Sequence, residues 1–296
     1  MTSPPISQSV LGLLIFSSPW AAGAELGPHP QDHRFDSAAR VEYLSRNARD
    51  LDWQALLSGK ERVFYLGDYH PNPAIAAEAA SAMAQIKAAG ITHVALELPD
   101  ALQPALDAWM RAGERERELR RFFDEKCGPG VAARDLGLMK SVRAQGLQLV
   151  AIDQESTGFS QDLSPRDRWM AGRLAGILRD PKARILVFCG ANHVRRSNQP
   201  KLLHELGWSS RSYCFLTSGV NYKSKETMDD VRKSRIYDQE IYELAESLKK
   251  TKLGLKRLFL SLGKGADFDG YISIPAVRSQ KVVGLWVDLE EVPAKD

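Results

Sequence analysis

Four apolar runs of strand length constrain the fold of this chain more than any other feature of its sequence. They are Arg62–Gly67, Thr92–Leu98, Leu147–Asp153 and Arg184–Gly190. Each run is apolar almost without interruption, whereas a strand with one face in water alternates apolar and polar residues. The pattern is therefore typical of strands that are buried on both faces of a parallel sheet.

Segments with a helical pattern separate these runs. The segment Ser164–Arg179 begins with an N-cap Ser, a Pro at the first helical position and an acid in the first turn. The other expected helices are Ser37–Ala48, Pro73–Ala89, Ala101–Lys126 and Val131–Gln145. The alternation of strands and helices predicts an α/β fold, with a mainly parallel sheet flanked by helices. The charged stretch 100–131 is longer than a crossover needs and predicts an inserted helical lid or subdomain.

The last third of the chain has a weaker pattern. Candidate strands are Arg211–Thr217, Gly270–Ile274 and Val282–Val287, and a charged helical insertion is expected at about 225–260. We expect residues 37–296 to form a single α/β domain, because a chain of 296 residues can bury one large core.

The N-terminal residues resemble an export signal. Residues 1–24 combine the apolar run Val10–Phe16 with a small-residue cleavage pattern, and 25–36 has the composition of a linker. This predicts a periplasmic or extracellular protein, and a cytoplasmic one if the segment is not a signal. The apolar run is too short to cross a bilayer, so no transmembrane segment is expected. A net charge of only +3 argues against a nucleic-acid partner.

A Gly-x-x-His motif follows two of the four apolar runs, in LGDYH (Leu66–His70) and in CGANH (Cys189–His193). Ligands of parallel sheets bind outside the carboxyl ends of the strands. We therefore expect the polar residues at these ends to share one site. They are Asp68, His70, Glu97, Asp153 and His193.

Two kinds of chemistry suit such a set. His70, His193, Glu97 and Asp68 could ligate a divalent metal ion that activates water. Alternatively, a histidine oriented by a carboxylate could deprotonate water without a metal. Either arrangement predicts hydrolysis of an ester or amide in a small molecule or peptide.

Arg166 is a further candidate, because the helix macrodipole disfavours a cation in the first turn of a helix. Such a placement is explained if Arg166 pairs with a carboxylate of the site or holds an anionic group. The alternative is that Asp167 and solvent satisfy it. The other candidates also have structural alternatives, since Asp68 could form an Asx-turn and Asp153 could cap the following loop.

The four segments LGDYHPNP, VALELP, SPRDRWMA and VFCGANHV together resemble a known superfamily. It contains ChaN-like haem-uptake proteins, Tiki and TraB-type proteins and erythromycin esterases, and the ChaN-like branch is the most similar. The resemblance implies an α/β core with inserted helices and a site built from both Gly-x-x-His motifs. It assigns Asp68, Glu97 and Arg166 to the acidic and basic positions of that site.

The resemblance leaves two functional hypotheses open. Tiki proteins and the esterases imply a metal-dependent peptidase or an esterase, which agrees with the hydrolase predicted from the residues. The ChaN-like branch instead implies a protein that binds haem or iron without catalysis. Ile75 and Ala76 stand where that branch often has further histidines, so we prefer the hydrolase.

Overall fold

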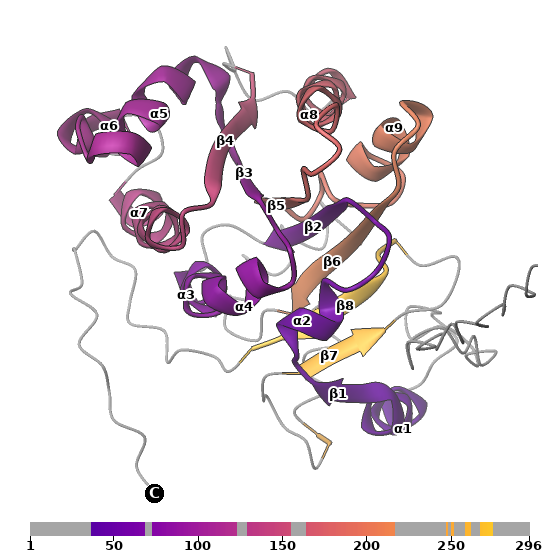
Figure 1. The fold of residues 1–296 in the computed structure, drawn as a ribbon. Coiled ribbons are helices and arrows are strands. Elements are labelled where there is room, and N and C mark those ends of the chain that lie inside the picture. The colour runs from indigo at the N-terminus through magenta and orange to yellow at the C-terminus, as the bar shows by residue number, and fades with distance from the viewer. Residues whose placement is uncertain are drawn as a thin grey trace, which may run out of the picture.

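The computed structural model describes residues 37–68, 73–122, 129–154, 164–216, 247, 250–251, 258–261 and 267–274. In this part of the chain, helices flank one eight-stranded sheet (Figure 1). The predicted α/β fold is therefore confirmed. The predicted signal peptide (1–24), the linker (25–36) and the strand Val282–Val287 lie outside the described residues and stay predictions, as does most of the insertion at 225–260.

The strand order in the sheet is β1-β7-β8-β6-β2-β5-β3-β4. The strands are β1 Ala48–Asp50, β2 Val63–Asp68, β3 His93–Pro99, β4 Gln148–Asp153, β5 Ile185–Gly190, β6 Ser210–Leu216, β7 Leu258–Ser261 and β8 Gly270–Ser273. Strands β8, β6, β2, β5, β3 and β4 pair in parallel, while β7 pairs antiparallel with both β1 and β8. The four apolar runs thus form β2 to β5, which are adjacent at one half of the sheet.

Helices cover both faces of the sheet (Figure 1). They are α1 Ser37–Asn47, α2 Trp53–Leu56, α3 Pro73–Ser81, α4 Met83–Ala88, η1 Asp100–Leu102, α5 Gln103–Ala112, α6 Glu116–Phe122, α7 Pro129–Ala144, α8 Ser164–Ile177 and α9 Gln199–Glu205. Phe64 and Leu66 of β2 pack in the core beneath α2 to α7, while Val63 and Tyr65 pack in the core beneath α1, α8 and α9. Burial on both faces explains why the sequence of β2 does not alternate. No helix of the described segments has the length and apolar character needed to span a membrane.

The structure differs from the sequence prediction in two segments. The expected helix Ala101–Lys126 is interrupted at Gly113, whose left-handed backbone (φ 73°) ends α5 before α6 begins. The end of the insertion expected at 225–260 includes Leu258–Leu260, which lie in strand β7 rather than in a helix. Pairing with β1 and β8 explains this, because these partners come from distant parts of the chain.

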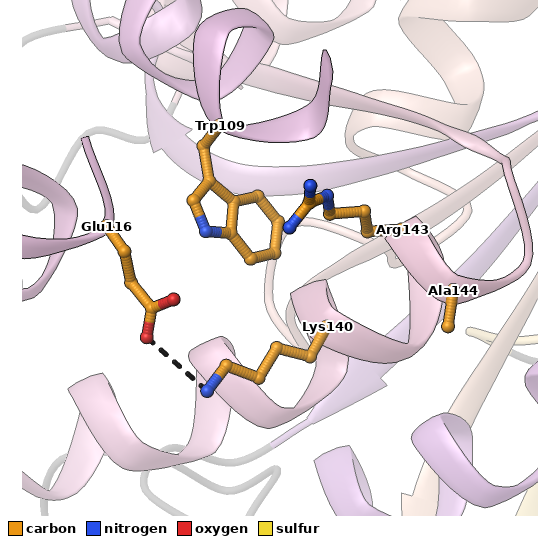
Figure 2. A pocket seen from close by; sticks show the side chains of 5 residues that line it. All are labelled: Trp109, Glu116, Lys140, Arg143 and Ala144. Carbon is orange, nitrogen blue, oxygen red and sulfur yellow. Dashed lines mark ion pairs between the residues drawn. The ribbon is translucent and has the colours of Figure 1, made fainter. Parts of the chain in front are cut away.

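The helices α5, α6 and α7 form a hollow of about 400 Å³ (Figure 2). Its lining residues are Trp109, Glu116, Lys140, Arg143 and Ala144. These helices belong to the layer of α2 to α7, and none of the residues predicted for the site at the strand ends lines the hollow.

Gly67 allows two chain segments to meet at the carboxyl end of the sheet. A Cβ atom on Gly67 would lie 2.4 Å from Cγ2 of Val194 and 2.9 Å from Cα of Ala191. The backbone N–H of Ala191 donates a hydrogen bond of 2.8 Å to the carbonyl of Asp68. The glycine of the first Gly-x-x-His motif therefore makes room for the turn that contains the second motif.

Candidate functional site

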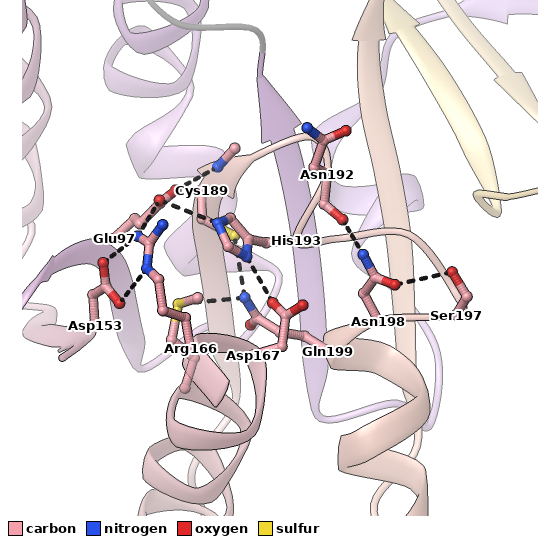
Figure 3. Close-up of polar contacts among 12 residues, drawn as sticks. Glu97, Asp153, Arg166, Asp167, Cys189, Asn192, His193, Ser197, Asn198 and Gln199 are labelled. Atoms are coloured by element: carbon pink, nitrogen blue, oxygen red, sulfur yellow. Dashed lines mark hydrogen bonds and ion pairs between the residues drawn. The ribbon is translucent and has the colours of Figure 1, made fainter. Parts of the chain in front are cut away.

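Four of the side chains predicted from the sequence meet at the carboxyl ends of β3, β4 and β5 (Figure 3). Glu97 lies near the end of β3, and Asp153 is the last residue of β4. Arg166 lies in the first turn of α8, and His193 lies in the turn after β5. Because these strands are adjacent and parallel, residues up to 96 positions apart in the sequence become neighbours at one edge.

Arg166 lies between two carboxylates. Its Nε donates to Oδ1 of Asp153 over 3.1 Å, and its Nη2 donates to Oε1 of Glu97 over 2.8 Å and to Oδ2 of Asp153. Burial disfavours the charged guanidinium, but the contacts with Asp153 and Glu97 outweigh burial and hold the pKa of Arg166 above its usual value. These carboxylates offset the unfavourable position of this cation in the first turn of α8.

Glu97 connects Arg166 to the end of β5. Its Oε2 accepts a hydrogen bond of 2.7 Å from the backbone N–H of Gly190, while its Oε1 accepts from Arg166. A buried carboxylate is costly unless it is paired and hydrogen-bonded, and both conditions hold here. The second glycine of the paired motifs thus contributes a backbone donor to the carboxylate of β3.

His193 lies between the carboxylates of Asp167 and Glu97. Its Nδ1 lies 2.6 Å from Oδ1 of Asp167, and its Nε2 lies 3.4 Å from Oε1 of Glu97. Burial disfavours the charged imidazolium, but the hydrogen bonds with Asp167 and Glu97 outweigh that cost and raise the pKa of His193 to about 9. The histidine is therefore an imidazolium at neutral pH, with its Nδ1–H donated to Asp167.

Asp167 was not among the residues predicted for the site. The sequence prediction placed it at the start of the helix, as a favourable acid or as a partner of Arg166. In the structure it is only 2% exposed. The spacing did contain a signal. Asp167 shares a helical stripe with the buried residues Met170, Ala171 and Leu174. An acid on an apolar stripe requires a partner, and that partner is His193.

The turn that contains His193 is fixed by several hydrogen bonds (Figure 3). Asn198 Nδ2 donates to the carbonyl of Asn192 over 2.6 Å, and the backbone N–H of Gln199 donates to the carbonyl of His193 over 3.2 Å. The side chain of Gln199 is fully buried, and its Nε2 lies 3.3 Å from Sδ of Met170. The turn therefore has its own hydrogen-bonded framework, which limits the positions that the imidazole can adopt.

Residues 267–269 also form hydrogen bonds and ion pairs with the residues that follow His193 in this turn. Arg195 Nη1 lies 3.0 Å from Oδ2 of Asp267, and the backbone N–H of Arg196 donates to the carbonyl of Asp267 over 2.8 Å. Arg196 also pairs with Asp269, whose Oδ2 accepts from the backbone N–H of Ser212 in β6 over 2.7 Å. The sequence analysis did not identify these two aspartates, because nothing local indicates a partner some 70 residues away.

Asp68 ends β2 and is 1% exposed. Its backbone carbonyl accepts from Ala191, so it lies beside the turn that precedes His193. His70 lies outside the described residues, and its part in the predicted site stays a prediction.

The described residues fit a hydrogen-bonded acid–base site better than a metal centre. Both carboxylate oxygens of Glu97 already accept hydrogen bonds, from Arg166 and from Gly190. A metal ion at His193 would have to replace a proton whose pKa is raised to about 9. Within the described segments, no group of three or more His, Cys, Asp or Glu side chains is placed to hold a metal ion. The predicted ligation by His70, His193, Glu97 and Asp68 stays untested, because His70 lies outside those segments.

No protein-family model matches the sequence, and no curated protein matches it. Several solved structures show a low similarity to the chain, including the three that follow. The first is the RRSP effector domain of a MARTX toxin from Vibrio vulnificus, with 20% identity and a TM-score of 0.44 over 56% of this chain and 36% of that chain. The second is the C-terminal region of Pasteurella multocida toxin, described as having a thiol-protease like catalytic triad, with 12% identity and a TM-score of 0.43 over 64% and 29%. The third is ChaN of Campylobacter jejuni, described with cofacial haem binding, with 13% identity and a TM-score of 0.41 over 57% and 86%.

Proposed function

We propose that the protein is a hydrolase that cleaves an ester or amide bond at the carboxyl ends of β3, β4 and β5. The observation that supports this most directly is the buried pair of His193 and Asp167, which lies in contact with Glu97. A histidine whose one ring nitrogen is fixed by a carboxylate presents its other nitrogen for proton transfer.

In this proposal, His193 acts as a general acid. Its Nε2 lies 3.4 Å from Glu97, which is longer than an ordinary N–H···O bond of about 2.9 Å. Glu97 therefore holds the Nε2 proton loosely, and that proton can pass to the leaving oxygen or nitrogen of the substrate. A pKa of about 9 keeps His193 protonated for this step at neutral pH.

Arg166 would stabilise the developing oxyanion. About a quarter of its side chain is exposed, and Glu97 and Asp153 fix its guanidinium in place. A fixed cation needs no reorganisation when the carbonyl oxygen gains negative charge, which is the basis of electrostatic stabilisation of transition states.

The attacking water needs a base, and we assign it to the end of β2. Asp68 and His70 are the predicted groups there, and the carbonyl of Asp68 is bonded to the turn that precedes His193. The water proton passes to one of these groups, and the water oxygen bonds to the substrate carbonyl carbon. The bond from that carbon to the leaving oxygen or nitrogen then breaks as His193 protonates the leaving group. The two protein groups then recover their protonation through solvent.

Steady-state kinetics with a panel of activated esters and peptide amides test this function. We expect His193→Ala to lower kcat by about 10²–10⁴-fold, the usual contribution of general acid–base catalysis. His204→Ala is the matched control, because His204 is an exposed residue of α9 and takes no part in the site. We also expect kcat to fall as pH rises through about 9, where His193 loses its proton. Full activity in His193→Ala, or equal losses in both variants, would contradict the proposal.

The alternative that the protein binds haem depends on residues outside the described segments. Within those segments, His193 would have to lose a proton whose pKa is raised to about 9 before it could ligate iron. Tyrosine is another possible ligand of haem iron, but Tyr65 and Tyr271 are fully buried in the core beneath α1, α8 and α9. Ligation of haem iron by His193 would therefore require loss of that proton, and ligation by either tyrosine would require a change of conformation. Titration with hemin checks the alternative, because a Soret shift that is lost in His70→Ala would support it.

A further inference from the structure

The hollow between α5, α6 and α7 contains a cation that is fixed in position. Arg143 stacks against the ring of Trp109, with its Cζ atom 5.3 Å from the ring centroid, and its Nε donates to the carbonyl of Met110 over 3.2 Å. Gly113 makes room for the guanidinium, since a Cβ atom there would lie 2.9 Å from Nη1 of Arg143. Because three neighbours fix this side chain, little conformational entropy remains to be lost when Arg143 binds a ligand.

Among the described residues that line the hollow, Glu116 is the carboxylate, and it is paired with a cation. Glu116 accepts two hydrogen bonds from Arg120, of 3.0 and 2.7 Å, and these, with smaller contributions from Lys140 and Trp109, lower its pKa. Lys140 lies farther away, with its Nζ 3.4 Å from Glu116 and half of its side chain exposed (Figure 2). Glu116 is thus paired mainly with Arg120, and Lys140 and Arg143 retain N–H donors that can reach a ligand.

Lys140 and Arg143 lie three residues apart on α7 and line the same hollow. Side chains with this spacing lie on one face of a helix, about 5–6 Å apart at their Cβ atoms. A planar or tetrahedral oxyanion can therefore accept from the ammonium and the guanidinium together. The volume of about 400 Å³ lies within the range of small-molecule sites.

We propose that this hollow is a second binding site, which takes a small molecule with a carboxylate or phosphate attached to an apolar group. Lys140 and Arg143 bind the oxyanion, and the apolar group lies against the exposed side chain of Ala144. The site uses none of the residues assigned to hydrolysis and does not depend on the proposed function. Carboxylate and phosphate share the chemistry that these two cations recognise.

Isothermal titration calorimetry tests the site with three probes of similar size, which are 3-phenylpropionate, phenyl phosphate and phenethylamine. We expect at least one of the two anions to bind and the amine not to bind. The preferred anion identifies the oxyanion. Affinity should fall at least about tenfold in Lys140→Met and in Arg143→Met, since each change removes one charged partner, and it should weaken as salt is added.

Lys182→Met is the matched control, because Lys182 is exposed in the loop before β5 and does not line the hollow. Its affinity for the anion should equal that of the unmodified protein. If Arg143→Met fails to fold because it loses the hydrogen bond to Met110, Lys140→Met still tests the site. Half of the Lys140 side chain is exposed, so its replacement should leave the fold intact. Three outcomes would overturn the proposal. These are no binding of either anion at millimolar concentration, equal binding of the amine, and unchanged affinity in folded Lys140→Met.

Discussion

The pair of Asp167 and His193 makes the stability of the protein depend on pH in a way that can be calculated. The pKa of His193 is raised from 6.5 to about 9 by its partners, even though burial lowers it. This net shift corresponds to about 3 kcal/mol of stabilisation of the charged ring. Asp167 is the closer partner, at 2.6 Å against 3.4 Å for Glu97. Asp167→Asn keeps a hydrogen-bond acceptor of the same shape and removes only the charge. We therefore assign about 2 kcal/mol to the charge of Asp167.

The sign follows from the direction of the shift. A raised pKa stabilises the folded state fully below the unfolded value of about 6.5, and this stabilisation disappears as pH rises through about 9. Urea unfolding should therefore show that Asp167→Asn costs about 2 kcal/mol near pH 6 and under about 1 kcal/mol near pH 9.5. Titration of the imidazole by NMR should show the pKa of His193 falling from about 9 to about 7.5, because 2 kcal/mol corresponds to about 1.5 pKa units.

Glu205→Gln is the control, because it removes an exposed carboxylate whose partner Lys201 lies 3.6 Å away. Exposed pairs of this kind contribute about 0–1 kcal/mol, so the change should be small at both pH values. The reasoning is refuted if His193 still titrates near 9 in Asp167→Asn. It is also refuted if the loss of stability is the same at both pH values.

Three further predictions concern the same edge of the sheet. In thermal unfolding, Gly67→Ala should destabilise the protein by about 1–3 kcal/mol, because the new Cβ would overlap the turn after β5. Gly137→Ala lies on an open helix surface and should instead stabilise the protein by about 0.5–1 kcal/mol. Arg166→Lys should lower kcat by about 10²-fold with a smaller change in KM, because an ammonium cannot contact both Glu97 and Asp153 as the guanidinium does. Prolonged dialysis against a chelator should leave the activity unchanged. A loss of activity that is reversed only by adding a divalent metal would show that the acid–base assignment is wrong.

The central strands could be predicted from the sequence because their signal is local. Strands β2, β3 and β5 are buried on both faces and the edge strand β4 over most of its length, so an almost continuous apolar run was sufficient to identify them. The antiparallel edge could not be predicted in the same way. Strand β1 has only three residues, two of them exposed, and β7 lies within a charged stretch. These short strands are stabilised by pairing with distant partners rather than by their own pattern.

The candidate site was predictable to the extent that it follows from strand order. Glu97, Asp153 and His193 come at or just after the carboxyl ends of parallel strands, and adjacent parallel strands bring such residues together. The assignment of the two charges at the start of α8 could not be made. Neighbouring residues on a helix point about 100° apart, so the rotation of α8 against the sheet decides that Arg166 contacts Glu97 and that Asp167 reaches His193.

The geometry also changes the chemistry that the sequence suggested for His193. From its type and position, this histidine was expected to ligate a metal or to deprotonate water, and both tasks need a neutral ring. Among the described residues joined by these ion pairs, two cations, Arg166 and His193, lie among three carboxylates, Glu97, Asp153 and Asp167. With this excess of negative charge, loss of the His193 proton would leave three carboxylates facing one cation. The network thus favours the imidazolium, so in the proposed hydrolysis His193 gives a proton and the end of β2 is assigned the group that accepts the proton from water.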